Sequence, residues 1–325
     1  NLAMGYHSQG KFDMAVKCYK QVLSHKQNSP ETHFGLGNVF FDQGNMLEAI
    51  VSFKQVISYM PNNATAHNKL GTAYHSQGKL EEAIQCYKRA ISLMPNFIQP
   101  RNNIGCVLCE RGELEAAAIS LRYALKLNPD YADGHCNLGN VLKEQGKLAE
   151  AISSYRKTIE LNPNYTDVHS NLLLSLHYSS SYNSKSIFDE HIAWANTLKI
   201  NSANKPDFKN KKDPEKRLRI GYISPDFRDH SIVSFLEPIF SHHDEKKCEI
   251  FCYSAVLRPD KTTMRLKQMS HHWESVIGLS TDQIVALIRN DEIDILIDLN
   301  GHTGKNYLLV FAHKPAPIQV TYLGY

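Results

Sequence analysis

Two polar loops in the second half of the chain contain the residues best suited to chemistry. One loop spans residues 224–230 and the other spans 300–306, and each follows a short apolar run. The residues of interest are Asp226, Asp229 and His230 in the first loop, and Gly301, His302 and Thr303 in the second. A neutral imidazole, whose pKa lies near 6.5, can accept a proton from a hydroxyl group, so His230 and His302 are candidate catalytic residues. The alternative is that both histidines are structural.

The stretches around these loops alternate between predicted strands and predicted helices. The strands are predicted at 219–224, 248–254, 273–277, 293–299 and 318–323, and the helices at 231–240, 261–269, 280–290 and 308–313. This order is typical of βαβ units, which form a mostly parallel sheet. Because both loops follow strands, we expect them at the carboxyl edge of the sheet, where ligands bind in open α/β folds. The first loop has no Gly-x-Gly-x-x-Gly pattern, which argues against dinucleotide binding there.

The first half of the chain repeats one pattern every 34 residues. Each copy reads Gly-x-x-x-x-Ala, and the copies begin at Gly10, Gly44, Gly78, Gly112 and Gly146. A period of this length is typical of helix–turn–helix solenoids. The glycine is expected to end the first helix of each repeat, and a following proline to stop the second. Small residues recur where the two helices should cross, at Gly37, Gly71, Gly105 and Gly139.

Asparagine recurs at one position of the first helix, two residues before the small residue. The recurring residues are Asn103, Asn137 and Asn171. In a stacked array this position faces the concave surface, where a row of amides can hydrogen-bond the backbone of an extended peptide. The alternative is that the amides bond one another within the array. The earlier repeats carry Gly35 and Lys69 at this position.

The change of periodicity divides the chain into three parts. We expect an array of five repeats and a partial sixth at 1–178, a helical connector with a basic linker at 179–216, and an α/β segment at 217–325. The connector helix should pack through Phe188 and Ile192, with Trp194 beside them. Asn1 falls inside a repeat, so we expect the natural start of the protein to be missing.

Composition limits the partners that the chain can have. The formal net charge is +3, too close to neutral to indicate nucleic-acid binding. No apolar run approaches the roughly 18 residues that a membrane-spanning helix needs. The seven cysteines include one Cys-x-x-Cys pair, Cys106 and Cys109, without a second pair. We therefore expect no metal site, and reduced thiols of the kind found in the cytosol or nucleus.

Three motifs of the α/β segment, together with the repeats, resemble the protein O-GlcNAc transferase family, which includes the SPINDLY-type O-fucosyltransferases. The motifs lie at 217–230, 295–303 and 315–325. The resemblance implies a GT-B glycosyltransferase with two Rossmann-like lobes, of which 217–325 would be the amino-terminal one. It also implies a nucleotide-sugar donor, no metal, and inversion at the sugar carbon. The acceptors would be Ser and Thr hydroxyls of nuclear and cytoplasmic proteins.

The resemblance also points to individual residues. His230 matches a histidine that faces the active site, which makes it a candidate for acceptor positioning or proton transfer. His302 and Thr303 match a loop at the lobe junction, where animal O-GlcNAc transferases have tyrosine in place of His302. Animal members also carry Asp and His where this chain has Ala286 and Arg289. These differences leave both GlcNAc and fucose open as the transferred sugar.

The sequence therefore predicts a protein O-linked N-acetylglucosaminyltransferase that uses UDP-GlcNAc and holds its acceptor proteins in the repeats. The alternatives are an O-fucosyltransferase that uses GDP-fucose, and a non-enzymatic repeat scaffold. Family members continue into a second lobe after the last motif, so we expect residues 1–325 alone to be inactive. We further expect nuclear and cytoplasmic localisation, and the repeats offer a surface for a homodimer.

Overall fold

The chain forms two compact units, Asn1–Asn164 and Tyr165–Tyr325, in a computed structural model that describes residues 2–198, 208–304 and 306–322. The division falls before the predicted end of the repeat array at 178, so the helix that follows Tyr165 is grouped with the carboxyl-terminal unit. Part of the predicted basic linker, the end of the last predicted strand and the last three residues of the third motif lie outside the described residues.

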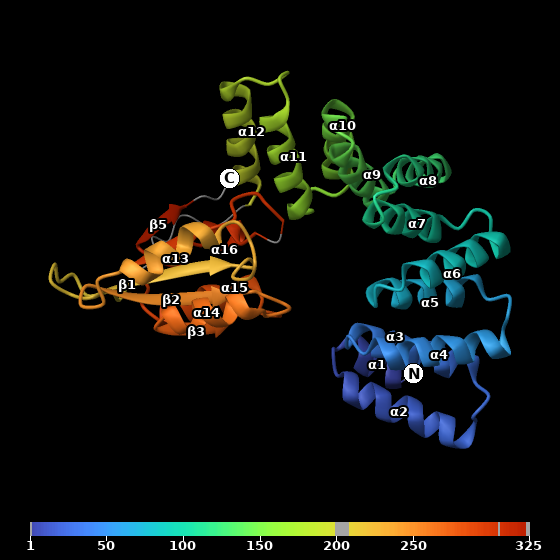
Figure 1. The fold of residues 1–325 in the computed structure, drawn as a ribbon. Coiled ribbons are helices and arrows are strands. Elements are labelled where there is room, and N and C mark those ends of the chain that lie inside the picture. The colour runs from blue at the N-terminus through green and yellow to red at the C-terminus, as the bar shows by residue number, and fades with distance from the viewer. Residues whose placement is uncertain (1, 199–207, 305, 323–325) are drawn as a thin grey trace. The chain divides into compact units, whose positions relative to one another are not determined.

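The amino-terminal unit consists of helices that follow one another in antiparallel pairs (Figure 1). They are α1 (Leu2–Ser8), α2 (Phe12–His25), α3 (Pro30–Asp42), α4 (Met46–Tyr59), α5 (Ala64–Ser76), α6 (Leu80–Leu93), α7 (Ile98–Glu110), α8 (Leu114–Leu127), α9 (Ala132–Glu144) and α10 (Leu148–Leu161). Each pair corresponds to one repeat, with an odd-numbered A helix and an even-numbered B helix. The A helices α5, α7 and α9 contact one another in sequence, so one face of the unit is lined by A helices. This confirms the predicted helical solenoid.

The turn between the two helices of a repeat has the geometry that its glycine demands. Gly78 follows α5 with φ +73°, a left-handed conformation that glycine adopts without a Cβ penalty. The N–H of Lys79 donates to Tyr74 O at 3.0 Å and that of Gly78 to His75 O at 2.8 Å, which is the Schellman pattern of helix termination. The same positive φ recurs at Gly10, Gly44, Gly112 and Gly146. The 34-residue signature therefore encodes this turn.

The paired helices approach closely because a large side chain of the B helix packs against a glycine of the A helix. A Cβ on Gly71 would come within 2.7 Å of the Tyr87 ring, and one on Gly139 within 2.5 Å of the Tyr155 ring. Phe53 and Leu121 approach Gly37 and Gly105 in the same way. These four side chains are fully buried and form the core between the paired helices.

Replacing Gly139 by alanine should destabilise the amino-terminal unit by about 1–3 kcal/mol, because the added methyl group overpacks the Tyr155 ring. The matched control is Gly5→Ala, since a Cβ at Gly5 meets no atom within 4 Å. That change should be neutral or stabilising by up to about 1 kcal/mol, as alanine favours the helix. Urea unfolding followed by far-ultraviolet circular dichroism measures both effects. Equal shifts of the two variants would contradict the packing argument.

The carboxyl-terminal unit begins with two helices and continues into a parallel sheet. The helices are α11 (Thr166–Tyr178) and α12 (Ser184–Thr197). The strands are β1 (Leu218–Ser224), β2 (Cys248–Ser254), β3 (His272–Ser275), β4 (Ile295–Asp298) and β5 (Ile318–Thr321), and the helices between them are α13 (Val233–His242), α14 (Lys261–Met269), α15 (Thr281–Asn290) and α16 (Leu308–Ala312). All strand pairs are parallel in the order β3-β2-β1-β4-β5, which confirms the predicted βαβ organisation.

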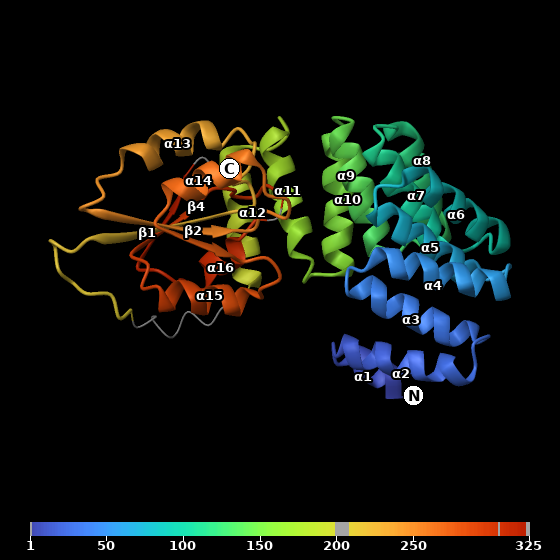
Figure 2. The same ribbon diagram turned by 60° about the horizontal axis from the view of Figure 1, so that its bottom comes forward.

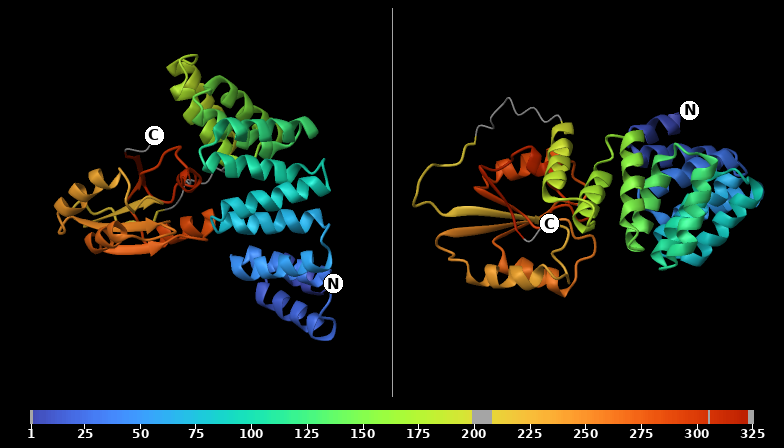
Figure 3. Two further views of the ribbon diagram at one scale, coloured as in Figure 1. Left: turned by 45° about the vertical axis from the view of Figure 1, so that its right-hand side comes forward. Right: turned by 90° about the horizontal axis from the view of Figure 1, so that it is seen from above.

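Helices cover both faces of this sheet, and two apolar clusters hold them there. Helices α13 and α14 pack on one face through a cluster that includes Leu236, Phe240 and Leu266. Helices α15 and α16 pack on the other face through a cluster that includes Ile288 and Val310 (Figure 2). Figure 3 shows the same sheet from two further directions. The register places Ile223 opposite Asp298, so β1 and β4 end side by side.

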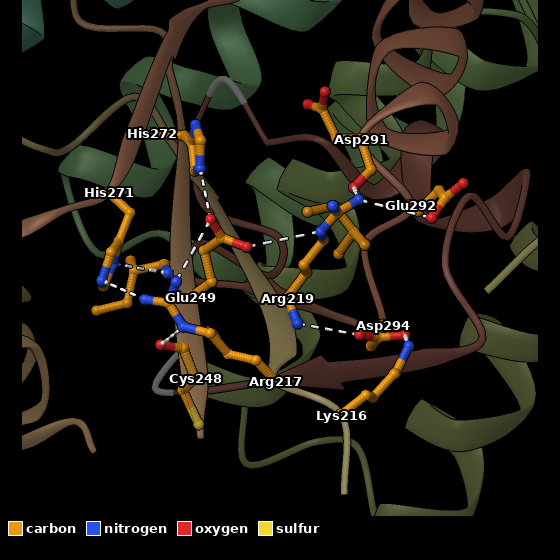
Figure 4. A network of polar contacts seen from close by, with 12 residues as sticks. Lys216, Arg217, Arg219, Cys248, Glu249, His271, His272, Asp291, Glu292 and Asp294 are labelled. Carbon is orange, nitrogen blue, oxygen red and sulfur yellow. Dashed lines mark hydrogen bonds and ion pairs between the residues drawn. The ribbon is translucent and has the colours of Figure 1, made fainter. Parts of the chain in front are cut away.

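A network of charged side chains crosses the strands at their amino-terminal ends (Figure 4). The carboxylate of Asp294 accepts the N–H of Arg219 at 3.0 Å and pairs with the ammonium group of Lys216. Glu249 bonds His272 at 2.9 Å, and this bond together with nearby arginines lowers the pKa of the Glu249 carboxyl. The network ties β1, β2, β3 and β4 together at the sheet edge opposite to the two predicted site loops. Its charges are paired, so we regard it as structural.

Candidate active site

The loop after β1 is held by hydrogen bonds at both ends. Ser224 Oγ accepts the N–H of Asp226 at 2.9 Å, and the ring of Phe227 is fully buried in the apolar cluster beneath α13. Further along, the N–H of Asp229 donates to Asp260 Oδ2 at 2.7 Å. This bond is the first cause of the lowered pKa of the Asp260 carboxyl. The loop is therefore anchored at both ends between β1 and α13.

His230 lies at the exposed end of this loop. Its Nδ1 accepts the N–H of Ile232 at 3.3 Å, and its backbone carbonyl accepts the N–H of Val233. In this arrangement the neutral ring carries its proton on Nε2. No partner for Nε2 is found among the described residues, so this N–H can be offered to a ligand oxygen. The long Nδ1 contact is weak, so the other tautomer is accessible at little cost.

The loop after β4 is built around the carboxylate of Asp298, which is 1% exposed. Asp298 Oδ1 accepts the N–H of Asn300 at 3.0 Å and Oδ2 accepts that of Gly301 at 2.9 Å. Burial raises the pKa of the Asp298 carboxyl, and the two backbone hydrogen bonds oppose this rise. Gly301 has φ +52°, which glycine tolerates. The carboxylate of Asp298 therefore fixes the backbone conformation of Asn300 and Gly301 directly after β4.

Asn300 joins the two loops. Its Nδ2 donates to Asp226 Oδ2 at 2.9 Å, and Asp226 also pairs with Arg228 at 3.2 Å. Asn300 Oδ1 is buried and has no hydrogen-bond partner within residues 208–304 or the other described parts of the chain. A buried acceptor without a donor is costly unless a ligand or water satisfies it. Asn300 was not among the predicted site residues, although it directly precedes Gly301 in the motif.

His302 points away from solvent and is 7% exposed. Its Nδ1 lies 3.2 Å from Ser170 Oγ on α11, and its ring centroid lies 4.8 Å from that of His191 and 5.1 Å from that of Trp194, both on α12. Asn306 Nδ2 donates to the same Ser170 oxygen at 3.1 Å. Burial first, then His191 and His177, lower the pKa of His302 to about 4. The imidazole is therefore neutral at pH 7 and ties this loop to α11 and α12.

The predicted site residues thus have different surroundings. Asp226 is linked to the second loop through Asn300, whereas Asp229, His230 and Thr303 are exposed. Thr303 Oγ1 donates to Asn300 O at 2.7 Å. No contact joins His230 to His302 among the described residues.

The connector helix forms as predicted and Trp194 packs, but the predicted packing face through Phe188 and Ile192 was wrong. Phe188 is 60% exposed and Ile192 is 46% exposed, so these side chains are not the packing face of α12. His191 and Trp194 contact His302 instead. The periodicity of the sequence identifies the most apolar face of the helix. The loop after β4, however, contacts α12 through the imidazole of His302, which packs against the rings of His191 and Trp194.

The asparagines of the A helices form hydrogen bonds along the array. Asn103 Nδ2 donates to Asn68 Oδ1 at 3.3 Å, and Asn137 Nδ2 donates to Asn102 Oδ1 at 2.9 Å. Each of these bonds links one repeat to the next. Asn68 and Asn102 are buried, whereas Asn103 and Asn137 are partly exposed. Asn103 Oδ1 also accepts a hydrogen bond from Asn102 Nδ2 at 3.4 Å. The third residue of the row, Asn171, lies on α11 in the carboxyl-terminal unit.

Three other features bear on the class of site. Within the described residues, no three His, Cys, Asp or Glu side chains are grouped so that they could hold a metal ion. Burial raises the pKa of the Cys106 thiol to about 12, so the Cys-x-x-Cys thiols are protonated at neutral pH. None of the described helices has both the length and the apolar character required to cross a membrane.

The fold and the two loops define a class, namely a tetratricopeptide-type array followed by a Rossmann-like unit with a polar site at its carboxyl edge. Comparison with protein-family models agrees with each part. Tetratricopeptide repeat models match residues 5–44, 37–78, 64–97, 105–146 and 132–165. The model described as Glycosyl transferase family 41 matches residues 163–325, which is half of the chain. The chain belongs to glycosyltransferase family 41.

Individual relatives point in the same direction. An Arabidopsis thaliana protein named "Probable UDP-N-acetylglucosamine--peptide N-acetylglucosaminyltransferase SPINDLY" is 37% identical over 157 residues, which cover 47% of this chain and 17% of the relative. A second Arabidopsis thaliana protein, with the same enzyme name but called SEC, is 41% identical over 112 residues, 34% of this chain and 11% of the relative. The structure of a mutant Thermobaculum terrenum O-GlcNAc transferase has a TM-score of 0.70 and 35% identity, covering 81% of this chain and 50% of that one. The chain thus spans under a fifth of these curated relatives.

The buried state of His302 predicts a specific pH dependence of stability. The pKa of His302 is about 4 in the folded chain and about 6.5 when unfolded, so the unfolded chain binds more protons between these values. Lowering the pH from 6.5 to 4 should therefore remove about 3 kcal/mol from the free energy of unfolding. The variant His302→Asn should lose much of this dependence. Fluorescence-detected unfolding reports it, because both tryptophans, Trp194 and Trp273, lie in the carboxyl-terminal unit.

The control for this experiment is His242→Asn, because His242 is exposed on α13. This variant should retain the pH dependence of the unaltered protein. If His302→Asn and His242→Asn show the same slope between pH 4 and 6.5, then His302 is not the group responsible.

Proposed function

We propose that this protein is a protein O-linked N-acetylglucosaminyltransferase that modifies Ser and Thr hydroxyls of other proteins. The observation that carries the proposal is the hydrogen bond between Asn300 and Asp226, which joins two family motifs at the carboxyl edge of the sheet. Parallel α/β sheets bind ligands at this edge. The names of the family-41 relatives specify the donor as UDP-GlcNAc.

The proposed reaction is a single displacement at the anomeric carbon of the donor sugar. The acceptor hydroxyl oxygen forms a bond to this carbon, the bond from the carbon to the phosphate oxygen breaks, and UDP leaves. The hydroxyl proton passes to a base that we do not assign. Inversion follows because the nucleophile and the leaving group occupy opposite sides of the carbon. No metal is required in this scheme.

Each loop residue has a role in the proposal that follows from its surroundings. His230 offers an N–H or, in its other tautomer, an unprotonated nitrogen to the acceptor hydroxyl. Asn300 holds the two loops together through its hydrogen bond to Asp226. His302 has a pKa too low for a general base at neutral pH and instead positions the loop. Asp226, Asp229, Gly301 and Thr303 belong to the loops that carry these groups.

The remaining assignments concern the rest of the protein. We propose that the repeats at 1–178 bind acceptor polypeptides along the A helices, with Asn103, Asn137 and Asn171 in contact with the peptide backbone. Residues 179–216 connect the array to the lobe at 217–325, which would be one half of a GT-B catalytic domain. We place the protein in the cytoplasm and nucleus, where its acceptors would be found, and allow for dimerisation through the repeats.

Sugar transfer by the complete translation product of the transcript, with residues 1–325 assayed in parallel, tests the proposal. UDP-GlcNAc and a protein acceptor are supplied, and the modified acceptor is detected by mass spectrometry. His230→Ala should reduce the rate at least 10-fold, because the hydroxyl loses a positioned hydrogen-bonding group. His242→Ala is the matched control and should retain full activity. Undiminished transfer by His230→Ala would remove His230 from the site.

A further inference from the structure

Helix α11 carries a buried hydroxyl group that contacts the second site loop twice. Ser170 is 3% exposed, and its Oγ lies 3.2 Å from His302 Nδ1. The same oxygen accepts a hydrogen bond from Asn306 Nδ2 at 3.1 Å. His302 and Asn306 lie on either side of Thr303 and Gly304, which are exposed. Both sides of this exposed stretch are therefore held by one side chain of α11.

The hydroxyl group of Ser170 has the bonding capacity for both contacts. A serine hydroxyl has one proton to donate and two lone pairs with which to accept. Because Asn306 donates to Ser170 Oγ, the serine proton can be donated to Nδ1 of the neutral His302 ring. Alanine at position 170 would remove both hydrogen bonds at once and leave the buried Nδ1 without this partner.

Hydrogen bonds continue from Asn306 through the second loop into the first. Asn306 Nδ2 also donates to Thr303 O at 3.2 Å, and the N–H of Thr303 donates to Asn300 O at 3.0 Å. Asn300 Nδ2 in turn donates to Asp226 Oδ2 at 2.9 Å. A continuous series of hydrogen bonds therefore runs from α11 to the loop that carries His230.

The residue after Ser170 belongs to the row of asparagines to which the proposed function assigns acceptor binding. Asn171 occupies the repeat position of Asn103 and Asn137. Successive residues of an α-helix point about 100° apart, so Ser170 and Asn171 lie on different faces of α11. Ser170 contacts the loop, whereas Asn171 is partly exposed. Adjacent residues of one helix thus contact the site loop and belong to the acceptor row.

Helix α12 encloses His302 from another side but does not fix its direction in the same way. The ring centroid of His302 lies 4.8 Å from that of His191 and 5.1 Å from that of Trp194. Ring packing of this kind tolerates a range of tilts and offsets, whereas a hydrogen bond to Nδ1 has a preferred distance and angle. The direction in which the loop leaves His302 therefore depends on Ser170.

We propose that Ser170 is a positioning residue that determines which Ser or Thr of a bound acceptor is modified. Its hydroxyl holds Thr303 and Gly304 at a fixed place relative to α11, while Asn171 holds the acceptor backbone on the same helix. An acceptor hydroxyl is modified when it lies at the distance from Asn171 that this arrangement sets. The inference rests on the proposed function, because it takes the polypeptide at Asn171 to be the acceptor.

The test compares Ser170→Ala with Ser175→Ala in the complete translation product. Ser175 is a second buried serine of α11, but its Oγ donates to Asn171 O at 2.7 Å and not to the loop. The acceptor is a polypeptide with a central run of alternating Ala and Ser between two segments that lack Ser and Thr. UDP-GlcNAc is the donor, and fragmentation in the mass spectrometer locates each modified serine.

The unaltered protein and Ser175→Ala should modify one serine of the run in preference to its neighbours. Ser170→Ala should reduce this preference about fivefold, because the loop loses a fixed orientation. The KM for the acceptor should change less than about twofold, since Asn171 is retained, whereas kcat should fall. An unchanged preference in folded Ser170→Ala, an equal loss in Ser175→Ala, or no preference in the unaltered protein would each overturn the proposal.

A second variant covers the case in which Ser170→Ala does not fold. Asn306→Ala removes the other partner of the same hydroxyl at a partly exposed position, so its fold is less at risk. It should reduce the preference among serines in the same direction. Circular dichroism establishes which variants are folded. A folded Asn306→Ala variant with the preference of the unaltered protein would contradict the proposal.

Hydrogen exchange of residues 1–325 measures the contact of Ser170 without donor or acceptor. The N–H of Thr303 should exchange about 10-fold faster in Ser170→Ala and at an unchanged rate in Ser175→Ala. Equal rates in the two variants would overturn the proposal. If exchange responds as expected but the complete protein transfers no sugar, the enzymatic function fails and the loop contact remains. If sugar is transferred with an unchanged preference in Ser170→Ala, the positioning role fails and the enzymatic function remains.

Discussion

The candidate site depends on one buried carboxylate at the end of β4. Asp298 is almost fully enclosed and is stabilised by the N–H groups of Asn300 and Gly301, which it holds in a tight turn. Because that turn is fixed, Asn300 reaches across to Asp226 on the neighbouring loop and His302 reaches back to Ser170 on α11. A carboxylate in this position cannot be exchanged for a neutral apolar group without releasing both backbone donors. The two loops and the helix pair therefore form one connected assembly within the carboxyl-terminal unit.

The repeat array depends on a different constraint, which is close contact between an aromatic or aliphatic side chain and a glycine. This contact repeats along the array, and a hydroxyl group next to it provides an internal hydrogen bond in the repeats of Tyr87 and Tyr155. The repeats of Phe53 and Leu121 keep the packing against glycine, but their side chains have no hydroxyl group to form this bond.

Much of the fold could be predicted because local chemistry determines it. The glycine turns require φ > 0 every 34 residues, and the strands alternate with amphipathic helices. The surroundings of His302 could not be predicted, because its partner Ser170 lies 132 residues away in the sequence and no local pattern links them. The exposure of Phe188 could not be predicted either, because α12 packs against His302, which is far away in the sequence. The sequence shows that Phe53 and Leu121 replace the tyrosine of the other repeats, but the burial of Asn38 Oδ1 without a partner among the described residues required the structure.

The central claim is that the two joined loops belong to an enzyme that transfers N-acetylglucosamine. The most direct measurement offers UDP-GlcNAc and GDP-fucose together to the complete translation product and records the mass of the sugar added to the acceptor protein. The account predicts N-acetylhexosamine, and no product when acceptor hydroxyls are removed by Ser→Ala and Thr→Val changes. Addition of deoxyhexose would contradict the assigned donor. The absence of any added sugar would contradict the enzymatic claim itself and leave a repeat protein that binds its partners without modifying them.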